Sequence, residues 1–556
     1  MKVIIVGGVA GGASAAARLR RLDEKAQIIL FERGAYISYA NCGLPYYIGG
    51  AITDREELTL QTPESFRLRF RVDVRVNTEV VSLHPKRKTV SVYEKRTGNT
   101  YEESYDKLIL SPGASPVLPP VDGLSGERVF TVRTIPDTDR VRSFMENENP
   151  QSAVILGGGF IGLELAENLM EAGLRVTVIE RADQLVTQLD YDVACELQLY
   201  ANEKGLRIQV NTSVQEVEET PKGLKLKLSD GTSVDTDMLF VCTGVRPESG
   251  LASAAQLACT ENGCIVVDDR MRTSDVDIYA VGDAVAVEDF VTKQSAHIPL
   301  AGPANRQGRI AADNICGLDS VYGGSQGSAI FKFFDQTVAM TGLSERTAKG
   351  AGFAYEKVYL YQGSHAGYYP GSTPMSMKVI FDTSDGRILG AQIVGSAGVD
   401  KRCDVLATLI RLKATYRDMV GLELCYAPPF SSAKDPVNMA GFVIENIMQG
   451  HIKQFHWHDV DGLPRDGSVT LLDVRHPSER RWGSIDGFMN IEVDNLREQI
   501  DTLPADKPIY VHCQSGLRSY IACRILQGYG YTCFNLAGGY RLYSVMRAAA
   551  TLFHGG

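Results

Sequence analysis

The chain has 556 residues, of which 44% are hydrophobic and 22% charged, which excludes a disordered, collagen-like or coiled-coil protein and predicts three to four domains at roughly 150 residues each. Its 57 basic and 67 acidic residues give a net charge of −10, which argues against a nucleic-acid partner, and no apolar run approaches the ~18 residues of a membrane-spanning helix. Eleven scattered cysteines without a CxxC pair predict a reduced, cytoplasmic protein that has neither a disulfide framework nor a metal site.

The N-terminal segment predicts a βαβ unit that binds a dinucleotide. A buried strand over Lys2–Val6 leads into a glycine-rich turn over 7–12, a helix over Ser14–Leu22 and a strand over Gln27–Phe31, which ends at Glu32. In such a unit the glycines and the helix N-terminus bind a pyrophosphate, and the acid accepts from a ribose hydroxyl. The same start mimics a signal peptide, but the phosphate-binding turn and the spacing of the acid favour the βαβ unit.

A second unit of the same pattern follows. Strand Ala153–Leu156 leads into a glycine turn over 157–162, a helix, and strand Arg175–Ile179, which ends at Glu180. Two such units are much stronger evidence for dinucleotide binding than one. The first turn departs from the usual glycine motif, because Val9 replaces its middle glycine. The Glu180 carboxylate favours NADH, whereas the following arginine would tolerate the 2′-phosphate of NADPH.

Polar and glycine residues also follow further apolar strands. They are Ser111, Gly113, Gly244, Gly282 and Asp283. Each alone is typical of an ordinary turn at the end of a strand, but their recurrence at sheet edges favours a nucleotide site. A carboxylate at such an edge can accept a hydrogen bond from the ribityl chain of a flavin.

The expected fold class is therefore α/β, with two Rossmann-like nucleotide-binding domains, an α+β interface domain and a C-terminal α/β module. The first nucleotide-binding domain is split over residues 1–112 and 245–326, and it encloses the second over 113–244. The interface domain covers 327–448, a linker rich in His and Asp covers 449–460, and the C-terminal module covers 461–556.

Cys42 lies in a segment that favours redox chemistry. It ends the motif Ser38-Tyr39-Ala40-Asn41-Cys42, and a glycine and a proline after it predict a helix start. A helix N-terminus lowers the pKa of a thiol, whereas the alternative is a buried structural cysteine. Because position 38 is serine, no neighbouring thiol can form a disulfide, so Cys42 must react with an external sulfur or become oxidised.

These motifs over residues 1–445 resemble the single-cysteine branch of the flavin-dependent disulfide reductases, which contains coenzyme A disulfide reductases and also NADH oxidases and peroxidases. The resemblance implies FAD and NADH, with NADPH possible. It assigns FAD to Gly7, Gly8, Ala10, Gly11, Gly12, Glu32, Arg33, Asn41, Ser111, Gly113, Gly282, Asp283 and Ala301. It assigns the nicotinamide nucleotide to Gly157, Gly159, Phe160, Ile161, Gly162, Glu180 and Gly244.

The resemblance also implies a coenzyme A site and a homodimer. Two motifs, over 365–371 and 426–431, each supply a tyrosine that reaches the partner's cysteine; these are Tyr368 and Tyr426, although Tyr369 competes with Tyr368. The alternative is a pair of packed interface aromatics. The implied coenzyme A residues are Ser14, Arg18, Arg21, Ser38, Asn41, Asn305, Arg306 and Lys434, with Arg69 and Arg71 as further candidates.

The C-terminal module resembles a rhodanese domain. Its loop runs from Cys513 to Arg518 with four residues between them, and its N–H groups point at the sulfur ahead of a helix. A related phosphatase loop is one residue longer, so the shorter loop favours sulfane sulfur carried on Cys513, with Arg518 completing the site. The alternative is an inactive rhodanese fold, which usually lacks the cysteine.

The resulting hypothesis is an FAD-dependent reductase of persulfides or polysulfides, coenzyme A persulfide included. It oxidises NADH, reduces its substrate through Cys42 and receives sulfane sulfur from Cys513. Three alternatives stay open: a coenzyme A disulfide reductase with a vestigial rhodanese module, an NADH oxidase or peroxidase that cycles through a sulfenic acid, and a non-catalytic sulfur carrier or redox sensor.

Overall fold

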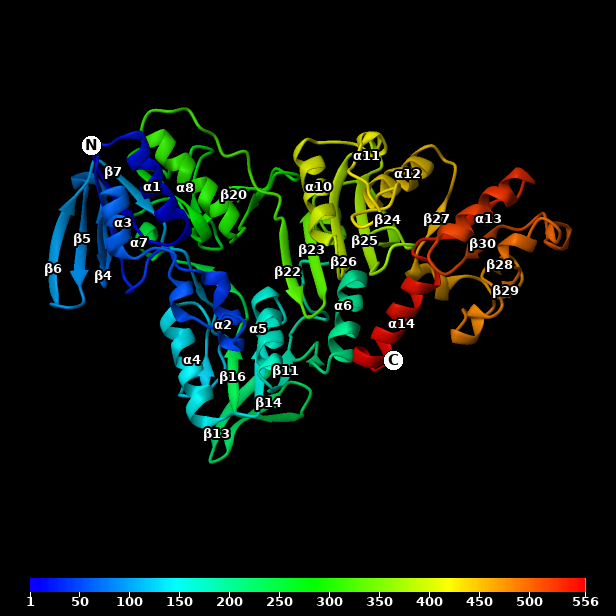
Figure 1. The fold of residues 1–556 in the computed structure, drawn as a ribbon, viewed down its shortest axis with the longest axis horizontal. Coiled ribbons are helices and arrows are strands. Elements are labelled where there is room, and N and C mark those ends of the chain that lie inside the picture. The colour runs from blue at the N-terminus through cyan, green and yellow to red at the C-terminus, as the bar shows by residue number, and fades with distance from the viewer. Residues whose placement is uncertain (556) are drawn as a thin grey trace. The chain divides into compact units, whose positions relative to one another are not determined.

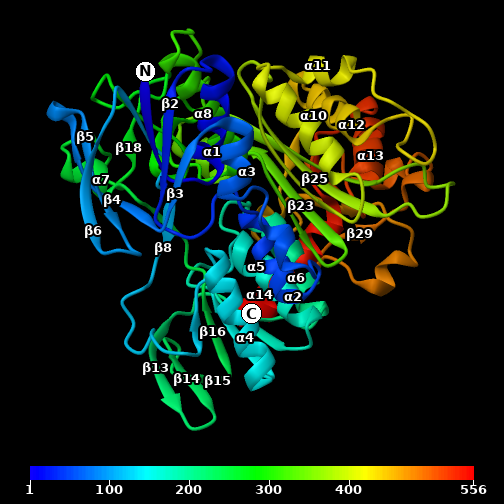
Figure 2. The same ribbon diagram turned by 60° about the vertical axis from the view of Figure 1, so that its left-hand side comes forward.

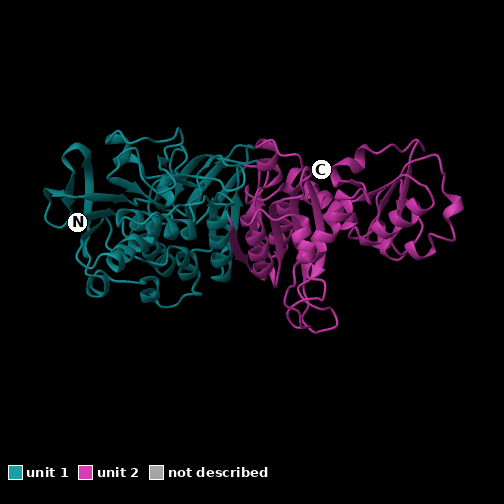
Figure 3. Cartoon of the chain, turned by 90° about the horizontal axis from the view of Figure 1, so that it is seen from above, with its two compact units in different colours: residues 1–181, 211–327 teal, residues 182–210, 328–556 magenta. Residues whose placement is uncertain are grey.

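The computed structural model describes residues 1–555, so Gly556, the last residue of the predicted C-terminal module, lies outside the described residues. The chain divides into two compact units, one of residues 1–181 and 211–327 and the other of 182–210 and 328–556 (Figure 3). Among residues 1–555, no helix combines the length and the apolar character needed to cross a membrane.

The first predicted βαβ unit is confirmed. Strand β1 (Lys2–Val6) lies at the centre of a five-stranded sheet of order β19-β7-β1-β2-β3, whose strands run parallel. Its apolar residues are buried, as expected of a parallel strand covered on both faces. Helix α1 (Ala10–Leu22) begins four residues earlier than predicted and packs on α8 (Ala301–Ile315). The other strands are β2 (Gln27–Glu32), β3 (Asp73–Val76), β7 (Lys107–Leu110) and β19 (Ile278–Ala280).

The second predicted βαβ unit is also confirmed, over residues 152–179. Strand β10 (Ser152–Leu156) pairs in parallel with β11 (Arg175–Ile179) and β16 (Met238–Val241), and α5 (Phe160–Glu171) connects β10 to β11. Strand β9 (Val129–Phe130) extends the sheet next to β16.

The remaining elements of the first unit include two small antiparallel sheets (Figure 1). They are β4 (Thr78–His84), β5 (Thr89–Glu94) and β6 (Asn99–Ser104); and β13 (Val214–Thr220), β14 (Gly223–Leu228) and β15 (Ser233–Thr236). Short helices and strands complete it: α2 (Leu44–Gly49), α3 (Pro63–Phe70), α4 (Ile135–Glu148), α7 (Gly250–Ala254), β8 (Ala114–Pro116), β17 (Val245–Pro247), β18 (Ile265–Val266), β20 (Val285–Glu288) and β21 (Ser295–Ala296).

The second unit contains the predicted α+β interface domain, an antiparallel sheet of order β22-β23-β26-β25-β24 covered by helices (Figure 2). Its strands are β22 (Ala329–Phe333), β23 (Gln336–Gly342), β24 (Tyr355–Gly363), β25 (Pro374–Asp382) and β26 (Ile388–Gly395). Its helices are α9 (Glu345–Gly350), α10 (Val399–Arg411), α11 (Tyr416–Gly421) and α12 (Pro436–Met448). Helix α10 packs on β23 and β26, and α12 packs on β24.

Helix α6 (Tyr191–Glu203) groups with elements of the C-terminal unit. The predicted second nucleotide-binding domain, 113–244, includes this helix, and residues 182–210 group with residues 328–556 in the compact units. A buried ion pair joins Asp192 of α6 to Lys378 of β25, at 2.8 Å.

The C-terminal module is a parallel sheet of order β27-β31-β30-β28-β29. Its elements are β27 (Gln454–Phe455), β28 (Thr470–Asp473), β29 (Met489–Asn490), β30 (Ile509–His512), α13 (Leu517–Gly528), β31 (Cys533–Leu536) and α14 (Gly539–His554). The predicted strand at Thr470–Val474 corresponds to β28. The segment predicted as a linker, 449–460, is in part a strand of this sheet, because β27 pairs with β31.

Candidate active site

The two glycine turns have the same backbone geometry. Gly7 and Gly157 have φ angles of +96° and +101°, a region that favours glycine. A Cβ at Gly12 would lie 1.9 Å from the Gly7 carbonyl oxygen, and one at Gly162 would lie 2.1 Å from that of Gly157. The glycines therefore allow each helix to begin directly against its strand, which brings the helix N-terminus to the edge of the sheet.

The two acidic residues fold over these turns in the same way. Glu32 Oε2 accepts from the Gly8 N–H at 3.0 Å, and Glu180 Oε2 accepts from the Gly158 N–H at 2.8 Å. Helices α1 and α5 both begin without a side-chain hydrogen bond from the N-cap residue. Each turn thus combines a helix N-terminus with a carboxylate, which suits a pyrophosphate and a ribose respectively.

The other residues predicted to bind FAD gather at one edge of the first sheet. Ser111 and Gly113 follow β7, and Gly282 and Asp283 follow β19; β1, β7 and β19 are neighbours and run parallel. Their carboxyl ends therefore meet where the turn over 7–12 lies. A Cβ at Gly7 would lie 2.0 Å from the Ser111 carbonyl oxygen, so these segments are in close contact.

The predicted residues outside this edge are placed as follows. Arg33 forms an exposed ion pair with Glu248 at 3.4 Å, and Ala301 is the exposed first residue of α8. Gly244 follows β16 with a φ of +110°. Gly159, Phe160 and Ile161 begin α5 at the second glycine turn.

Cys42 lies on a short 3-10 turn, Asn41–Gly43, that leads into α2. The residue is exposed. Arg133 holds its surroundings together: its carbonyl oxygen accepts from the Asn41 amide at 2.8 Å, and its guanidinium donates to the amide oxygen of the same side chain. The same guanidinium lies 3.7 Å from the Asp283 carboxylate. Arg133 therefore connects the cysteine loop to the sheet edge.

The protein environment of Cys42 does not promote its thiolate. Loss of water around the thiol raises its pKa, the carboxylates of Glu164 and Asp283 raise it further, and Arg133 alone opposes them. The pKa of Cys42 is thus raised, against the expectation that the helix start lowers it, and burial is the main cause, with the two carboxylates adding to it.

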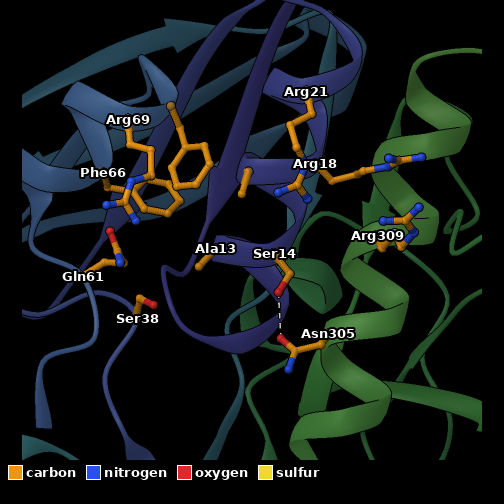
Figure 4. Close-up of a pocket in the computed structure, with 12 residues that line it drawn as sticks. Ala13, Ser14, Arg18, Arg21, Ser38, Gln61, Phe66, Arg69, Asn305 and Arg309 are labelled. Atoms are coloured by element: carbon orange, nitrogen blue, oxygen red, sulfur yellow. Dashed lines mark hydrogen bonds between the residues drawn. The ribbon is translucent and has the colours of Figure 1, made fainter.

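A pocket of about 380 Å³ lies beside this loop in the first unit (Figure 4). It is lined by Ala13, Ser14, Ala17, Arg18, Arg21, Ser38, Gln61, Phe66, Arg69, Phe70, Asn305 and Arg309. The Ser14 hydroxyl donates to the Asn305 amide oxygen at 2.7 Å, and Arg18 forms an ion pair with Asp313 at 2.6 Å. Several guanidinium groups and a phenylalanine pair thus share one pocket, which suits a ligand with phosphates and an aromatic base.

The pocket brings together most but not all of the predicted coenzyme A residues. Arg306 is absent from its lining because its guanidinium lies over the Tyr322 ring, 5.6 Å from the centroid. Arg309, one helical turn after Asn305, takes the place predicted for Arg306. Lys434 is exposed in the other unit, just before α12.

Tyr368 and Tyr426 lie together in the second unit. Their hydroxyl oxygens are 2.7 Å apart, and both side chains are exposed, Tyr368 by 75% and Tyr426 by 48%. The hydrogen bond to Tyr426 raises the pKa of Tyr368. In the single chain the predicted pair forms one exposed group of two phenols.

The loop of the C-terminal module surrounds Cys513 with donors. The Gly516 N–H donates to Cys513 Sγ at 3.1 Å, and Ser519 Oγ lies 3.2 Å from the same sulfur. Gly516 has a φ of +100° and immediately precedes α13. The N–H of Tyr540, from α14, donates to the Cys513 carbonyl oxygen at 2.8 Å. The loop is thus held in a shape that stabilises an anionic sulfur.

Sequence reasoning missed several residues of these sites. Arg133 carries no local signal, since it lies in an irregular segment between β9 and α4. Ser519 immediately follows the loop that ends at Arg518, and Arg309 follows Asn305 at helical spacing, so the sequence could have pointed to both. Glu479, which pairs with Arg518 at 2.6 Å, comes from a distant 3-10 turn.

Comparisons with known proteins divide the chain into the same kinds of domain as the sequence predicts. Residues 1–308 match the family model of pyridine nucleotide-disulphide oxidoreductases, 328–436 match the dimerisation domain of that family, and 457–545 match a rhodanese-like domain. A coenzyme A disulfide reductase from Staphylococcus aureus (strain JH9) is 36% identical over 442 residues, which cover 79% of this chain and 99% of that protein.

Two solved structures cover nearly the whole chain. The crystal structure of reduced Bacillus anthracis CoADR-RHD is 47% identical, with a TM-score of 0.96 and 98% of each chain covered. A NAD-dependent persulfide reductase from A. fulgidus is 36% identical, with a TM-score of 0.91 over 98% of this chain and 100% of that one. The chain therefore belongs to the pyridine nucleotide-disulphide oxidoreductase family; it is an oxidoreductase with a C-terminal rhodanese-like domain, and the family implies FAD and NAD(H) as its cofactors.

Proposed function

We propose that this protein reduces the sulfur–sulfur bond of persulfides, coenzyme A persulfide in particular, to hydrogen sulfide and a thiol at the expense of NADH. The observation that carries the proposal is the Cys513 loop, in which an N–H and a hydroxyl face the sulfur. A disulfide reductase has no use for such a carrier of sulfane sulfur, whereas a persulfide reductase does. The persulfide reductase from A. fulgidus, similar over nearly the whole chain, supports the same activity.

The residues of the first unit fit the two cofactors. The glycine turn after β1, with Glu32, Ser111 and Asp283 at the same sheet edge, would hold FAD. The turn after β10 with Glu180 would hold NADH, and the carboxylate favours a free ribose hydroxyl over a phosphate. When bound, FAD passes the electrons of NADH to the sulfur at Cys42.

Cys42 would act as the nucleophile. Its thiolate attacks the outer sulfur of the persulfide, the sulfur–sulfur bond breaks, and the thiolate of coenzyme A leaves. Cys42 is then itself a persulfide that carries the substrate's proton, and two electrons break its sulfur–sulfur bond to release hydrosulfide and restore the thiolate. The arginines of the 380 Å³ pocket would bind the phosphates of coenzyme A, and Ser38 connects that pocket to the Cys42 loop.

The two phenols would act from the partner subunit. The match to a dimerisation domain supports a homodimer. In it, the hydrogen-bonded pair Tyr368 and Tyr426 would face the partner's Cys42 and donate a proton to the leaving thiolate. Their exposure in the single chain supports this role, since isolated packing would bury them.

Replacement of Cys42 tests the mechanism directly. Cys42→Ser should lower persulfide-dependent NADH oxidation by about a thousandfold or more, because serine cannot carry the sulfur. Flavin binding and flavin reduction by NADH, followed by absorbance, should be retained. Cys259→Ser, another partly exposed thiol, serves as the control and should keep full activity. Sulfide release by the Cys42 variant at the wild-type rate would contradict the mechanism.

Coenzyme A disulfide is a second candidate substrate, favoured by the same pocket and by the curated relative from Staphylococcus aureus. The attack of Cys42 would then give a mixed disulfide with coenzyme A. A steady-state comparison of coenzyme A disulfide, coenzyme A persulfide, polysulfide and oxygen under NADH, with sulfide measured, ranks these substrates. A higher kcat/KM with the disulfide than with the persulfide would reverse the assignment.

A further inference from the structure

The loop that carries Cys513 rests on the first turn of helix α14. A Cβ at Gly539, the first residue of this helix, would lie 2.7 Å from the Cys513 carbonyl oxygen. The next two residues, Tyr540 and Arg541, donate their backbone N–H groups to the carbonyl oxygens of Cys513 and Gln514, at 2.8 and 2.9 Å. The position of this helical turn therefore determines where the backbone of the loop lies.

The rest of α14 packs against α6 and the interface sheet, which belong to the same compact unit. Its buried residues form an apolar cluster with α6, onto which two rings of β24 pack: Leu542, Met546, Ala549 and Cys195, with Tyr359 and Tyr361. One helix thus contacts the Cys513 loop at its first turn and the interface domain along its length.

Arg541 joins these two contacts. Its guanidinium forms an ion pair with Glu196 of α6 at 3.3 Å and lies over the Tyr361 ring, 4.4 Å from the ring centroid. Glu196 is itself held, because its Oε1 accepts from the Ser376 hydroxyl of β25 at 2.6 Å. The side chains of the ion pair are 33% and 25% exposed. The backbone of Arg541 therefore bonds to the loop while its side chain is fixed to the interface domain.

We propose that Arg541 is a positioning residue for the loading of sulfur on Cys513. Its contacts with Glu196 and Tyr361 fix the first turn of α14, and this turn holds the loop in the geometry that the attack on the donor requires. The inference rests on the proposed role of Cys513 as a sulfur carrier.

The loading step shows which quantity the positioning affects. The Cys513 thiolate attacks the terminal sulfur of a polysulfide dianion, the adjoining sulfur–sulfur bond breaks, and the polysulfide leaves one sulfur atom shorter, still as a dianion. Cys513 becomes an anionic persulfide, so charge and electrons balance. Misplacement of a reacting group by about 1 Å can cost up to about a hundredfold in rate. A loosened loop should therefore lower the maximal rate of loading more than the affinity for the donor.

The test follows loading directly on the full-length holoenzyme. The protein is mixed with tetrasulfide in the absence of NADH, quenched with iodoacetamide, and the sulfur atom added to Cys513 is measured by mass spectrometry. In Arg541→Ala the maximal loading rate should fall about tenfold, whereas the tetrasulfide concentration for half of that rate should change less than about twofold. Arg541→Lys, which keeps a cation beside Glu196, should recover most of the loss.

Three further variants assign the effect to this one contact. Glu196→Ala removes the contact from its other side and should slow loading by a similar factor. The double variant Arg541→Ala with Glu196→Ala should be at most about twofold slower than either single variant, because both changes remove the same contact. Arg547→Ala, on the same helix, removes an ion pair with Asp461 in which both side chains are more than 60% exposed, and should load at the wild-type rate.

Two measurements separate positioning from general damage. Thermal melting checks that each variant is folded, and NADH oxidation with coenzyme A persulfide, which reaches Cys42 directly, should stay at the wild-type rate. Wild-type loading in Arg541→Ala, multiplied losses in the double variant, a loss that Arg541→Lys does not recover, or an equal loss with coenzyme A persulfide would overturn the positioning role. Absence of an added sulfur atom on wild-type Cys513 would overturn the carrier role itself.

Discussion

At the scale of single residues, the chemistry of Cys42 depends on charges that come from other segments. Burial contributes most to the raised pKa of the thiol, Glu164 of α5 and Asp283 of the sheet edge raise it further, and Arg133 lowers it. Burial also raises the pKa of Glu164, whose carboxylate accepts from the Tyr46 hydroxyl at 3.1 Å. The reactivity of Cys42 is thus a balance between one guanidinium and two carboxylates, and each can be changed separately.

Two substitutions should move the pKa of Cys42 in opposite directions. Arg133→Gln removes the cation and should raise it, whereas Glu164→Gln removes a negative charge and should lower it. The rate of iodoacetamide alkylation of Cys42 in the holoenzyme, measured against pH, gives the midpoint. Because alkylation needs the thiolate, its profile should shift to higher pH in the first variant and to lower pH in the second. If the alkylation profiles of both variants shifted in the same direction, the opposite effects of Arg133 and Glu164 on the pKa of Cys42 would be contradicted.

At the scale of elements, a buried cluster fastens α6 to the interface sheet. Lys378 of β25 is 1% exposed and lies within 3.1 Å of carboxylate oxygens of Asp190, Asp192 and Glu345. Asp190 is further bonded to Gln392 through both its carboxylate and its backbone N–H. Three carboxylates close enough to bind a metal ion are therefore bridged by an ammonium group instead.

Loss of Lys378 should destabilise the second unit strongly. Lys378→Met would leave the buried carboxylates of Asp190 and Asp192 without their counter-charge, although Glu345 keeps Lys357, and this costs about 3 to 5 kcal/mol. The control Lys349→Met, on the exposed side of α9, should change stability by less than about 0.5 kcal/mol. Calorimetric melting of both variants measures the difference.

The difference in stability between wild type and Lys378→Met should depend on pH, because of Glu345. Burial alone would raise the pKa of Glu345, but Lys378 and Lys357 together lower it to about 2. A lowered carboxyl pKa contributes stability above the unfolded value near 4.5 and loses it as the pH falls towards 2. The gap between wild type and Lys378→Met should therefore be largest above that range and shrink in acid. A stability difference between the two proteins that stays constant down to pH 3 would contradict a lowered pKa of Glu345.

Helix α14 connects the Cys513 loop to the interface sheet within the same unit. The backbone N–H groups of Tyr540 and Arg541 donate to the carbonyl oxygens of Cys513 and Gln514. The Arg541 side chain forms an ion pair with Glu196 of α6 at 3.3 Å and lies over the Tyr361 ring. One residue therefore contacts both the catalytic loop and the sheet on which the module packs.

At the scale of the whole molecule, the two cysteines to which we assign sulfur chemistry lie in different compact units. Cys42 belongs to the first and Cys513 to the second. All eleven cysteines are free, and the other buried ones lie among apolar residues, as Cys195 and Cys523 do. The proposed transfer of sulfur from Cys513 to Cys42 would therefore pass from one unit to the other.

Replacement of Cys513 tests this coupling. Cys513→Ser should slow NADH oxidation with polysulfide or protein-bound sulfur about tenfold or more, whereas coenzyme A persulfide, which reaches Cys42 directly, should be affected little. Cys533→Ala, a buried thiol of the same sheet, controls for loss of packing in the module. Equal loss with all substrates would contradict a delivery role.

Local patterns made a large part of this protein predictable. The glycine turns, their strands and the acids that follow depend on contacts within about 25 residues, so spacing alone locates them. The same holds for the Cys513 loop and its helix. Arg309 follows Asn305 at helical spacing, so the sequence could have pointed to it, whereas Arg306 stays a prediction, with its guanidinium over the ring of Tyr322.

The sequence by itself determined the two βαβ units with their glycine turns, the Cys42 motif and the Cys513 loop, because each is a short motif whose backbone geometry requires particular residues. Only the tertiary structure decided that Arg133 links Asn41 to Asp283, that α6 belongs with the interface sheet, and that Glu479 neutralises Arg518. These contacts join residues from distant segments through charge. Charged side chains occur throughout the sequence, and which of them meet is set by the packing of the strands and helices that carry them.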